Sequence, residues 1–345
     1  MSLPHTLRSA DDLVAAGLID AAEAGAVEQV AAAYAVAVTP AVAGLIDRAD
    51  PQDPIARQYV PSRAELTVAP TELSDPIGDS THSPIRGIVH RYPDRVLLTP
   101  ILACPIYCRF CFRRARVGQG EGALSEAELD AAMAYISGRT ELREVIVTGG
   151  DPLMLGAARI TALLGRLAAV PHLEVVRFHT RIPVADPDRV SEALVSALRS
   201  PRPASLAVWL AVHVNHPREL QPSARAAIAR LVEAGLPLVS QTVLLKGVND
   251  SVEVLEDLMR ALVRNRVHPY YLHHPDLAPG TSHFRPSLDE GRQLVRQLRG
   301  RLSGLAQPVY VLDIPGGHGK VPVGPEYRDG EHILDSGGGR HSYGD

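Results

Sequence analysis

The chain has 345 residues, of which 46% are hydrophobic, and its formal net charge is −4. This length and apolar content suffice for a sizeable core in one large α/β domain, with or without an extension. The mildly acidic balance gives no reason to expect a nucleic-acid partner, no stretch is a credible membrane span, and the N-terminus lacks the layout of a signal peptide. We therefore expect a cytoplasmic protein that contacts neither nucleic acid nor membrane.

Residues 1–85 are predicted to form a helical N-terminal extension. The spacing of apolar residues predicts a helix from about Asp11 to Ala35. The segment that follows contains several Asp-Pro pairs, which favour turns and irregular structure.

A regular alternation of strands and helices begins near Arg91. Ser125 with Glu128, and Ser287 with Glu290, form capping boxes that open two of the helices, and Gly138 can close the first. The strands are predicted from apolar, β-branched runs at Val96–Leu102, Glu144–Thr148, Leu173–His179, Leu206–Val214, Leu236–Leu245, His268–His274 and Val309–Leu312.

These continuously apolar strands predict a parallel sheet with helices on its faces. Six or seven such units favour a full or partial TIM-like (βα) barrel over residues 86–325, followed by a flexible tail at 326–345. In such a barrel the reactive residues lie on the loops after the strands. The notable residues of this sequence do follow the apolar runs.

The sequence contains three cysteines, Cys104, Cys108 and Cys111, directly after the first barrel strand. An odd number in so short a segment is a poor disulfide framework and indicates metal binding. Three thiolates can hold three irons of a [4Fe–4S] cluster and leave the fourth iron open for the amino and carboxylate groups of S-adenosylmethionine (SAM). The alternatives are a zinc site with a distant histidine as fourth ligand and a simple electron-transfer cluster, which normally has four cysteines.

A glycine-rich loop at 315–320 (PGGHGK) follows the last apolar run. A Walker phosphate loop is excluded, because it would need glycine at position 314 and Ser or Thr at position 321. Taken alone, the loop is either a surface turn with a solvated lysine or a flexible loop whose Lys320 condenses with the aldehyde of pyridoxal phosphate (PLP).

A series of motifs carries a resemblance over nearly the whole chain. The cysteine motif resembles that of the radical SAM superfamily, whose fold is a partial or full (βα) barrel. The whole series, in its order and spacing, resembles the lysine 2,3-aminomutase family. The motifs are HRYPDR at 90–95, CPIYCRFCFRR at 104–114, TGGDP at 148–152, HTRIP at 179–183, HVNHP at 213–217, QTVLLKGVND at 241–250, PYY at 269–271, HFR at 283–285 and PGGHGK at 315–320.

This resemblance implies three cofactors: a [4Fe–4S] cluster, SAM and PLP. Lys320 would hold PLP. The remaining cofactor contacts that the resemblance implies are Arg91, Tyr92 and Arg95 near the PLP phosphate, and Gly149, Gly150, Asp151, His213 and Gln241 around SAM.

The resemblance also implies how the substrate is held. Arg113 would pair with its carboxylate, and Asp276 and Asp313 would receive its ε-ammonium. Two carboxylates facing one ammonium compensate a cation whose burial would otherwise cost several kcal/mol. A glutamate-specific relative would not need these two carboxylates. The implied reaction moves the α-amino group of L-lysine to Cβ and gives β-lysine.

Several alternatives remain open. The substrate could be another basic amino acid, such as arginine or ornithine, or the β-lysine could serve the modification of elongation factor P. A radical SAM methyltransferase or RNA-modifying enzyme without PLP is the alternative from a different class, and Lys320 argues against it. A reductase, flavodoxin or ferredoxin would supply electrons, and a homo-oligomer is possible.

Overall fold

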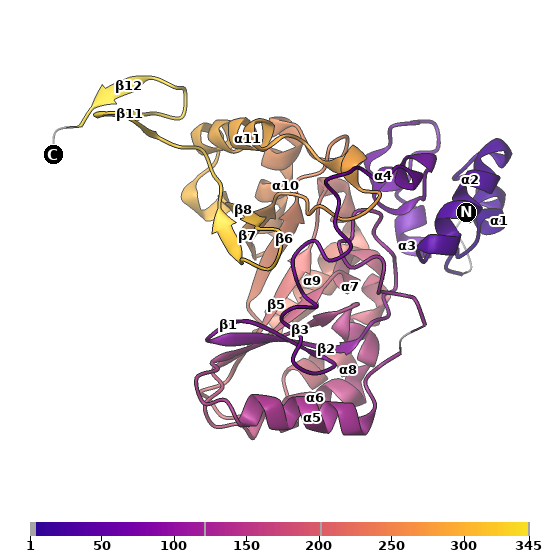
Figure 1. Cartoon of the computed structure of the whole chain (residues 1–345), viewed down its shortest axis with the longest axis vertical. Coiled ribbons are helices and arrows are strands. Elements are labelled where there is room, and N and C mark those ends of the chain that lie inside the picture. Colours follow the sequence, from indigo (N-terminus) through magenta and orange to yellow (C-terminus); the bar gives the residue numbers. More distant parts are fainter. Residues whose placement is uncertain (1–4, 121, 201, 344–345) are drawn as a thin grey trace.

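The computed structural model describes residues 5–120, 122–200 and 202–343. Its centre is a nine-stranded sheet whose strands follow one another in sequence order (Figure 1). Strands β2 to β8 run parallel, while β1 and β9 add antiparallel edges. The sheet curls without joining its two edges, so the predicted α/β barrel is confirmed in its partial form. The strands are β1 (Ile88–Tyr92), β2 (Arg95–Ile101), β3 (Glu144–Gly149), β4 (Val175–Thr180), β5 (Ala207–His213), β6 (Leu238–Val243), β7 (Val267–His273), β8 (Val309–Asp313) and β9 (Lys320–Pro322).

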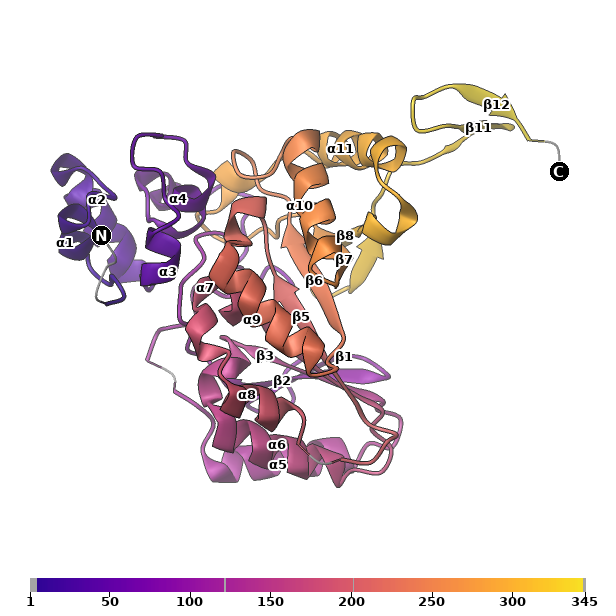
Figure 2. The ribbon, with the colours of Figure 1, turned by 180° about the vertical axis from the view of Figure 1, so that it is seen from behind.

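Helices follow the strands and cover the outside of the curled sheet, as both views show (Figures 1 and 2). Both predicted capping boxes are confirmed, since Ser125 and Ser287 accept hydrogen bonds from the third residue of their helices. Gly138 is the C-cap of the first, as expected. The helices are α5 (Glu126–Ser137), α6 (Ala157–Ala168), α7 (Ile182–Ala185), α8 (Glu192–Leu198), α9 (Pro222–Glu233), α10 (Val252–Arg264) and α11 (Leu288–Arg301).

The two faces of the sheet have different roles. Val145 and Val147 of β3 belong to the main core, together with Leu163 and Leu167 of α6. Glu144, Ile146 and Thr148, which alternate with these valines, line a cavity on the other face. Because successive strand residues point to opposite faces, apolar residues turned to the helices alternate with residues turned to the cavity. The helices therefore cover the outer face of the sheet, as the predicted partial barrel requires.

The N-terminal segment forms four short helices beside the barrel: α1 (Ala10–Ala15), α2 (Ala24–Ala33), α3 (Pro40–Ala43) and α4 (Pro54–Tyr59). The predicted continuous helix from Asp11 to Ala35 is wrong. Gly17, with φ of +64°, adopts the left-handed conformation that ends helices. This segment has a core of its own, which Ile106 of the cysteine loop and Ala185 of α7 complete.

The last described residues form a small antiparallel sheet of β10 (Arg328–Asp329), β11 (His332–Leu334) and β12 (Arg340–Ser342), which projects from the barrel (Figure 1). The sequence predicted a flexible tail at 326–345, whereas the structure shows regular strands over much of it. Glycines give turns, and the carboxylate of Asp335 accepts hydrogen bonds from the N–H groups of Gly337 and Gly339. Residues 344 and 345 of that tail, and residues 1–4 of the extension, lie outside the described ranges.

No helix within the described ranges is both long and apolar enough to cross a membrane.

Candidate active site

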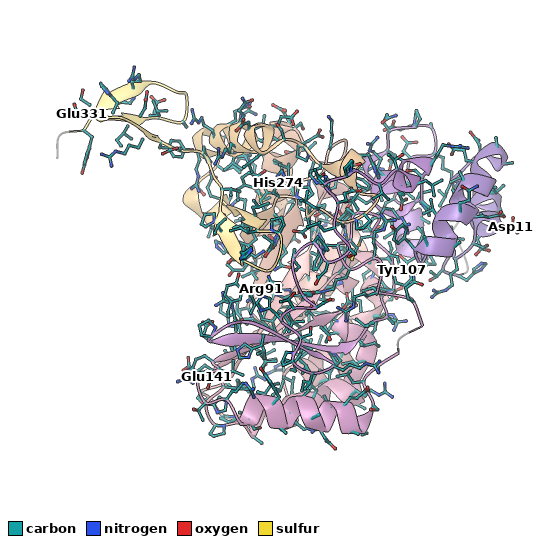
Figure 3. All side chains as sticks on the ribbon, in the orientation of Figure 1. Asp11, Arg91, Tyr107, Glu141, His274 and Glu331 are labelled. Carbon is teal, nitrogen blue, oxygen red and sulfur yellow. The ribbon has the colours of Figure 1, made fainter. Side chains whose placement is uncertain are left out.

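The concave face of the sheet surrounds a cavity of about 690 Å³. In Figure 3 the labelled Arg91 lies near the middle of the molecule. The structure brings every predicted site residue together on the wall of this single cavity. These residues are Arg91, Tyr92, Arg95, Cys104, Cys108, Cys111, Arg113, Gly149, Gly150, Asp151, His213, Gln241, Asp276, Asp313 and Lys320.

The cysteines lie on the long loop after β2, which packs against the N-terminal helices. Arg109 is 2% exposed, and its guanidinium is 2.7 Å from the Glu65 carboxylate, which also pairs with Arg114. The N–H of Arg109 donates to the carbonyl of Gln58 at 2.8 Å, and that of Tyr107 (labelled in Figure 3) to the carbonyl of Ala37 at 3.2 Å. The extension therefore fixes the shape of the cysteine loop.

Burial raises the pKa of all three thiols, that of Cys111 to about 11, with the neighbouring Cys108 as a second cause. Such thiols stay protonated at neutral pH until a metal displaces the proton. Within the described part of the chain, no group of three or more His, Cys, Asp and Glu side chains is placed to hold a single metal ion. In a [4Fe–4S] cluster each cysteine binds a different iron, so its thiols need not converge on one point. Three thiols on a loop at a cavity wall are a suitable donor set for such a cluster.

Glycines at the end of β3 let that strand lie close against the start of the cysteine loop. Gly149 has φ of +116°, and a Cβ at Gly150 would overlap the carbonyl of Ala103. The N–H of Gly150 donates to Ile101 at 2.8 Å, and that of Asp151 to Ala103 at 2.9 Å. Only glycine permits this approach of two backbones.

Asp151 turns its carboxylate away from the cavity. It accepts hydrogen bonds from the Thr180 hydroxyl at 2.8 Å and from the N–H of Arg181 at 2.6 Å, and from those of Leu153 and Ile182 at 3.1 Å. Burial nevertheless raises its pKa to about 6. Groups of the chain thus occupy the Asp151 carboxylate, and the contact with SAM that the resemblance implies for this segment stays a prediction for its backbone.

His213 and Gln241 are aligned with each other on β5 and β6. His213 Nε2 is 3.1 Å from the Asn215 amide oxygen, and its ring stands edge-on to Phe110 of the cysteine loop. Burial lowers the pKa of His213 well below its usual value, so the imidazole is neutral.

Lys320 lies at the start of β9, which pairs with β8. The hairpin between the two strands is the predicted glycine loop, and Gly316, Gly317 and Gly319 have φ from +85° to +91°. The ammonium pairs with Asp313 and lies 3.3 Å from His273 Nδ1. The backbone N–H of Lys320 donates to the Tyr92 hydroxyl at 2.7 Å.

Lys246 is the other lysine in the sequence, and it is exposed. A Schiff base with an aldehyde cofactor requires a primary amine, and lysine is the side chain that provides one. Of the two lysines, Lys320 is the one that lines the cavity, so it is the candidate for this bond. Tyr92, with the Arg95 guanidinium 3.9 Å above its ring, and Arg91 line the same part of the cavity. This arrangement fits a phosphate-bearing aldehyde such as PLP.

Asp79 connects two of the arginines that were predicted to bind ligands, and the sequence did not predict a role for it. Its carboxylate is 2.7 Å from Arg113 and 3.3 Å from Arg91, and all three side chains are largely buried. Arg91 is also 3.7 Å from Asp313. Asp79 lies in an irregular loop with no motif around it, so the sequence offered no signal for it.

Asp276, on the loop after β7, has a side chain for which the described residues provide no hydrogen-bond or ion-pair partner. Burial raises its pKa to about 7, and the carboxylate of Asp313 contributes to that shift. A partly buried carboxylate next to a second one favours a cationic ligand, since a cation beside Asp276 would stabilise its charged form.

The partial barrel, the three cysteines and the lysine hairpin indicate a class of enzyme, which comparison with protein families identifies. Residues 98–259 match the model of the Radical SAM superfamily, and residues 295–329 match the model named Lysine-2,3-aminomutase. The second match includes the whole hairpin from Asp313 to Lys320.

Similarity to characterised proteins narrows the class to a family. The chain is 41% identical to L-lysine 2,3-aminomutase of Clostridium subterminale over 85% of this chain and 69% of that protein. It is 38% identical to the Bacillus subtilis L-lysine 2,3-aminomutase over 94% of this chain and 68% of that one. The chain belongs to the lysine 2,3-aminomutase family, whose members use a [4Fe–4S] cluster, SAM and PLP.

The family contains more than one substrate specificity. Glutamate 2,3-aminomutase of Clostridioides difficile is 36% identical over 87% of this chain and 70% of that protein. The choice of substrate therefore depends on the side chains that line the cavity.

Proposed function

We propose that the protein converts L-lysine to β-lysine by moving the α-amino group to Cβ. One observation carries the choice of lysine: Asp276 is a partly buried carboxylate with no partner among the described residues, beside a second carboxylate, Asp313. Glutamate has no cation to place there, whereas the ε-ammonium of lysine matches both charges.

In this proposal Cys104, Cys108 and Cys111 hold the cluster, and the backbone of Gly149 to Asp151 and the side chains of His213 and Gln241 surround SAM. Lys320 holds PLP, with Arg91, Tyr92 and Arg95 near its phosphate. When bound, the cluster and SAM supply a radical that removes a hydrogen atom from the substrate, and PLP carries the migrating nitrogen.

The residues of the chain orient the substrate between two charged ends. Arg113 presents a planar guanidinium that can grip the α-carboxylate with two hydrogen bonds. Asp276 and Asp313 hold the ε-ammonium at the other end. Binding at both ends fixes Cα and Cβ in the cavity, which is how an enzyme selects one hydrogen among chemically similar ones.

The pair of Lys320 and Asp313 links cofactor binding to substrate binding. The amine of Lys320 must leave Asp313 and lose its proton before it can bind an aldehyde. Asp313 then keeps only the more distant guanidinium of Arg91, at 3.7 Å, and the substrate ammonium can take the place that the lysine vacated. One carboxylate thus serves the two ammonium groups in turn.

Arginine and ornithine also end in cations, and two carboxylates would accept either. The methyltransferase alternative lacks a use for the hairpin that carries Lys320. We further propose that the protein works in the cytoplasm, where thiols stay reduced, and receives electrons from a reductase, flavodoxin or ferredoxin.

The test is an anaerobic assay. The protein is reconstituted with iron, sulfide and PLP, reduced in the presence of SAM, and offered L-lysine, L-arginine, L-ornithine and L-glutamate separately. Formation of β-lysine, with no product from glutamate, is expected. Product from arginine or ornithine in preference to lysine would move the proposal to that substrate, and product from glutamate would contradict the role of the two carboxylates.

A further inference from the structure

Arg181, on the loop after β4, contacts one of the cysteines. Its Nη1 donates to Cys108 Sγ at 3.0 Å, and the side chain is 6% exposed. Its Nη2 donates to the Gln58 side chain at 2.7 Å and to the Glu219 carboxylate at 2.9 Å. One buried guanidinium therefore joins a carboxylate to a cysteine that the family motif assigns to the cluster.

Several groups hold this guanidinium in place. The Glu219 carboxylate accepts hydrogen bonds from the N–H of Asn215 at 3.0 Å and of His216 at 2.9 Å. It also accepts from the Tyr59 hydroxyl at 3.2 Å and from the Gln58 amide at 3.1 Å. Gln58 and Tyr59 come from α4 of the N-terminal extension, whereas Glu219 follows β5. Because separate parts of the chain fix Arg181, it cannot turn away from Cys108 without breaking this network.

The order of charges matters more than their sum. Arg181 touches Cys108, and Glu219 lies on the other nitrogen of the same guanidinium. The ion pair therefore directs its positive end at the thiol. In a buried setting of low effective dielectric, such an oriented pair acts strongly on a neighbouring redox centre.

We propose that Arg181 is a positioning residue that raises the reduction potential of the cluster through its hydrogen bond and charge at Cys108. Reduction transfers one electron from a low-potential reductant and converts [4Fe–4S]²⁺ to [4Fe–4S]⁺, with no bond broken and no proton moved. The product carries one more negative charge, which a nearby cation and a hydrogen-bond donor to sulfur stabilise. The inference rests on the cluster assignment under "Proposed function".

Four variants test the proposal. R181M removes the cation and the donor, E219Q removes the opposing anion and keeps Arg181, and R181M/E219Q removes both without leaving an unpaired buried charge. R218M is the matched control, since Arg218 is next to Glu219 in sequence but pairs with Asp53 and not with a cysteine.

Each reconstituted protein is titrated with dithionite in the presence of redox mediators, without SAM or substrate, and the reduced cluster is followed by electron paramagnetic resonance. The midpoint potential is expected to move down in R181M, up in E219Q and down in the double variant, and to stay at the wild-type value in R218M. Should R181M fail to assemble a cluster, E219Q and the double variant still decide the sign.

A purely structural role would lower the cluster content without this pattern of opposite shifts. Potentials unchanged in all variants, or an upward shift in the double variant, would overturn the proposal. Iron and sulfide are measured beforehand, because a wild-type protein that assembles no cluster would refute the cluster assignment, and this inference with it.

Discussion

The cysteine loop and the substrate end of the cavity both contain buried charges, but the charges have different partners. At the cysteine loop, Glu65 pairs with both Arg109 and Arg114, and Glu219 pairs with Arg181. These partners belong to the chain and are in place before any ligand arrives. The cysteine loop is therefore preorganised, and Arg109 and Arg114 hold its structure.

At the substrate end, the pairs are ones that ligands can replace. Lys320 pairs with Asp313, Arg113 pairs with Asp79, and Asp276 has no partner among the described residues. PLP would take Lys320, and lysine would supply one cation and one anion for the rest. Burial of a charge does not itself indicate function, because both regions contain buried charges. What separates the two regions is whether the neutralising partner is permanent.

The largest effect is expected for K320A, at the substrate end. Without the amine PLP cannot bind covalently, so kcat/KM should fall at least about 10³-fold. The absorbance of bound PLP should be lost, while iron content and thermal stability stay near wild type. K246A is the control, because Lys246 is the other lysine and lies outside the cavity. Retained PLP absorbance in K320A would refute the assignment.

The second prediction concerns the cysteine loop. E65Q leaves two buried arginines without their anion, which should cost about 3–5 kcal/mol of stability. Chemical denaturation of the protein without cofactors measures this directly. E174Q is the control: it breaks the exposed pair with Arg143 and should cost at most about 1 kcal/mol. Equal stability of E65Q and wild type would show that the loop is not held in the way we describe.

The sequence predicted the cysteine motif, the strands and the helix caps better than it predicted the carboxylates that support them. The cysteine spacing, the strand runs and the capping boxes at Ser125 and Ser287 are local patterns, and local patterns can be read from neighbours in the chain. Glu65, Asp79 and Glu219 act on arginines far away in the sequence. Only folding brings these partners together, so no spacing could reveal them.

The helix predicted from Asp11 to Ala35 shows that a local pattern can also mislead. Its apolar, Ala-rich composition favours a long helix, but Gly17 interrupts it with a left-handed backbone. A single glycine is tolerated inside many helices, and composition alone does not show which ones break. The lysine loop was ambiguous for a similar reason, since only its place on the cavity wall separates it from a surface turn.

The third prediction sharpens the assignment of the two carboxylates. D276N and D313N should each reduce kcat/KM for lysine about 10²- to 10³-fold, because one buried partner of the ammonium is lost. D313N should also weaken the hold on the Lys320 ammonium, so its PLP content is measured in parallel. The two variants differ in this respect, since Asp276, as described, makes no hydrogen bond or ion pair with Lys320. A D276N variant as active as wild type would remove the main argument for a basic substrate.

The smallest effect is a pH dependence centred on Asp276. Its pKa is raised to about 7, chiefly by burial and next by Asp313. Below that pH the carboxyl is protonated and neutral, so it cannot pair with an ammonium. The kcat/KM for lysine should therefore fall by about tenfold per pH unit below pH 7 and level off above it.

The same raised pKa of Asp276 has the opposite effect on the stability of the ligand-free protein: it lowers stability as the pH rises. A carboxyl whose folded pKa lies above its unfolded value of 3.8 favours the folded state when it is protonated. Its contribution to stability should thus be lost as the pH rises from about 4 through 7, the range in which its affinity for the substrate cation grows. In D276N the kinetic inflection should vanish, and the loss of stability should shrink to the part that Asp151 contributes, because burial raises the pKa of Asp151 to about 6. If only the kinetic inflection disappears, another group governs stability in this range; if neither does, Asp276 is not the group that titrates.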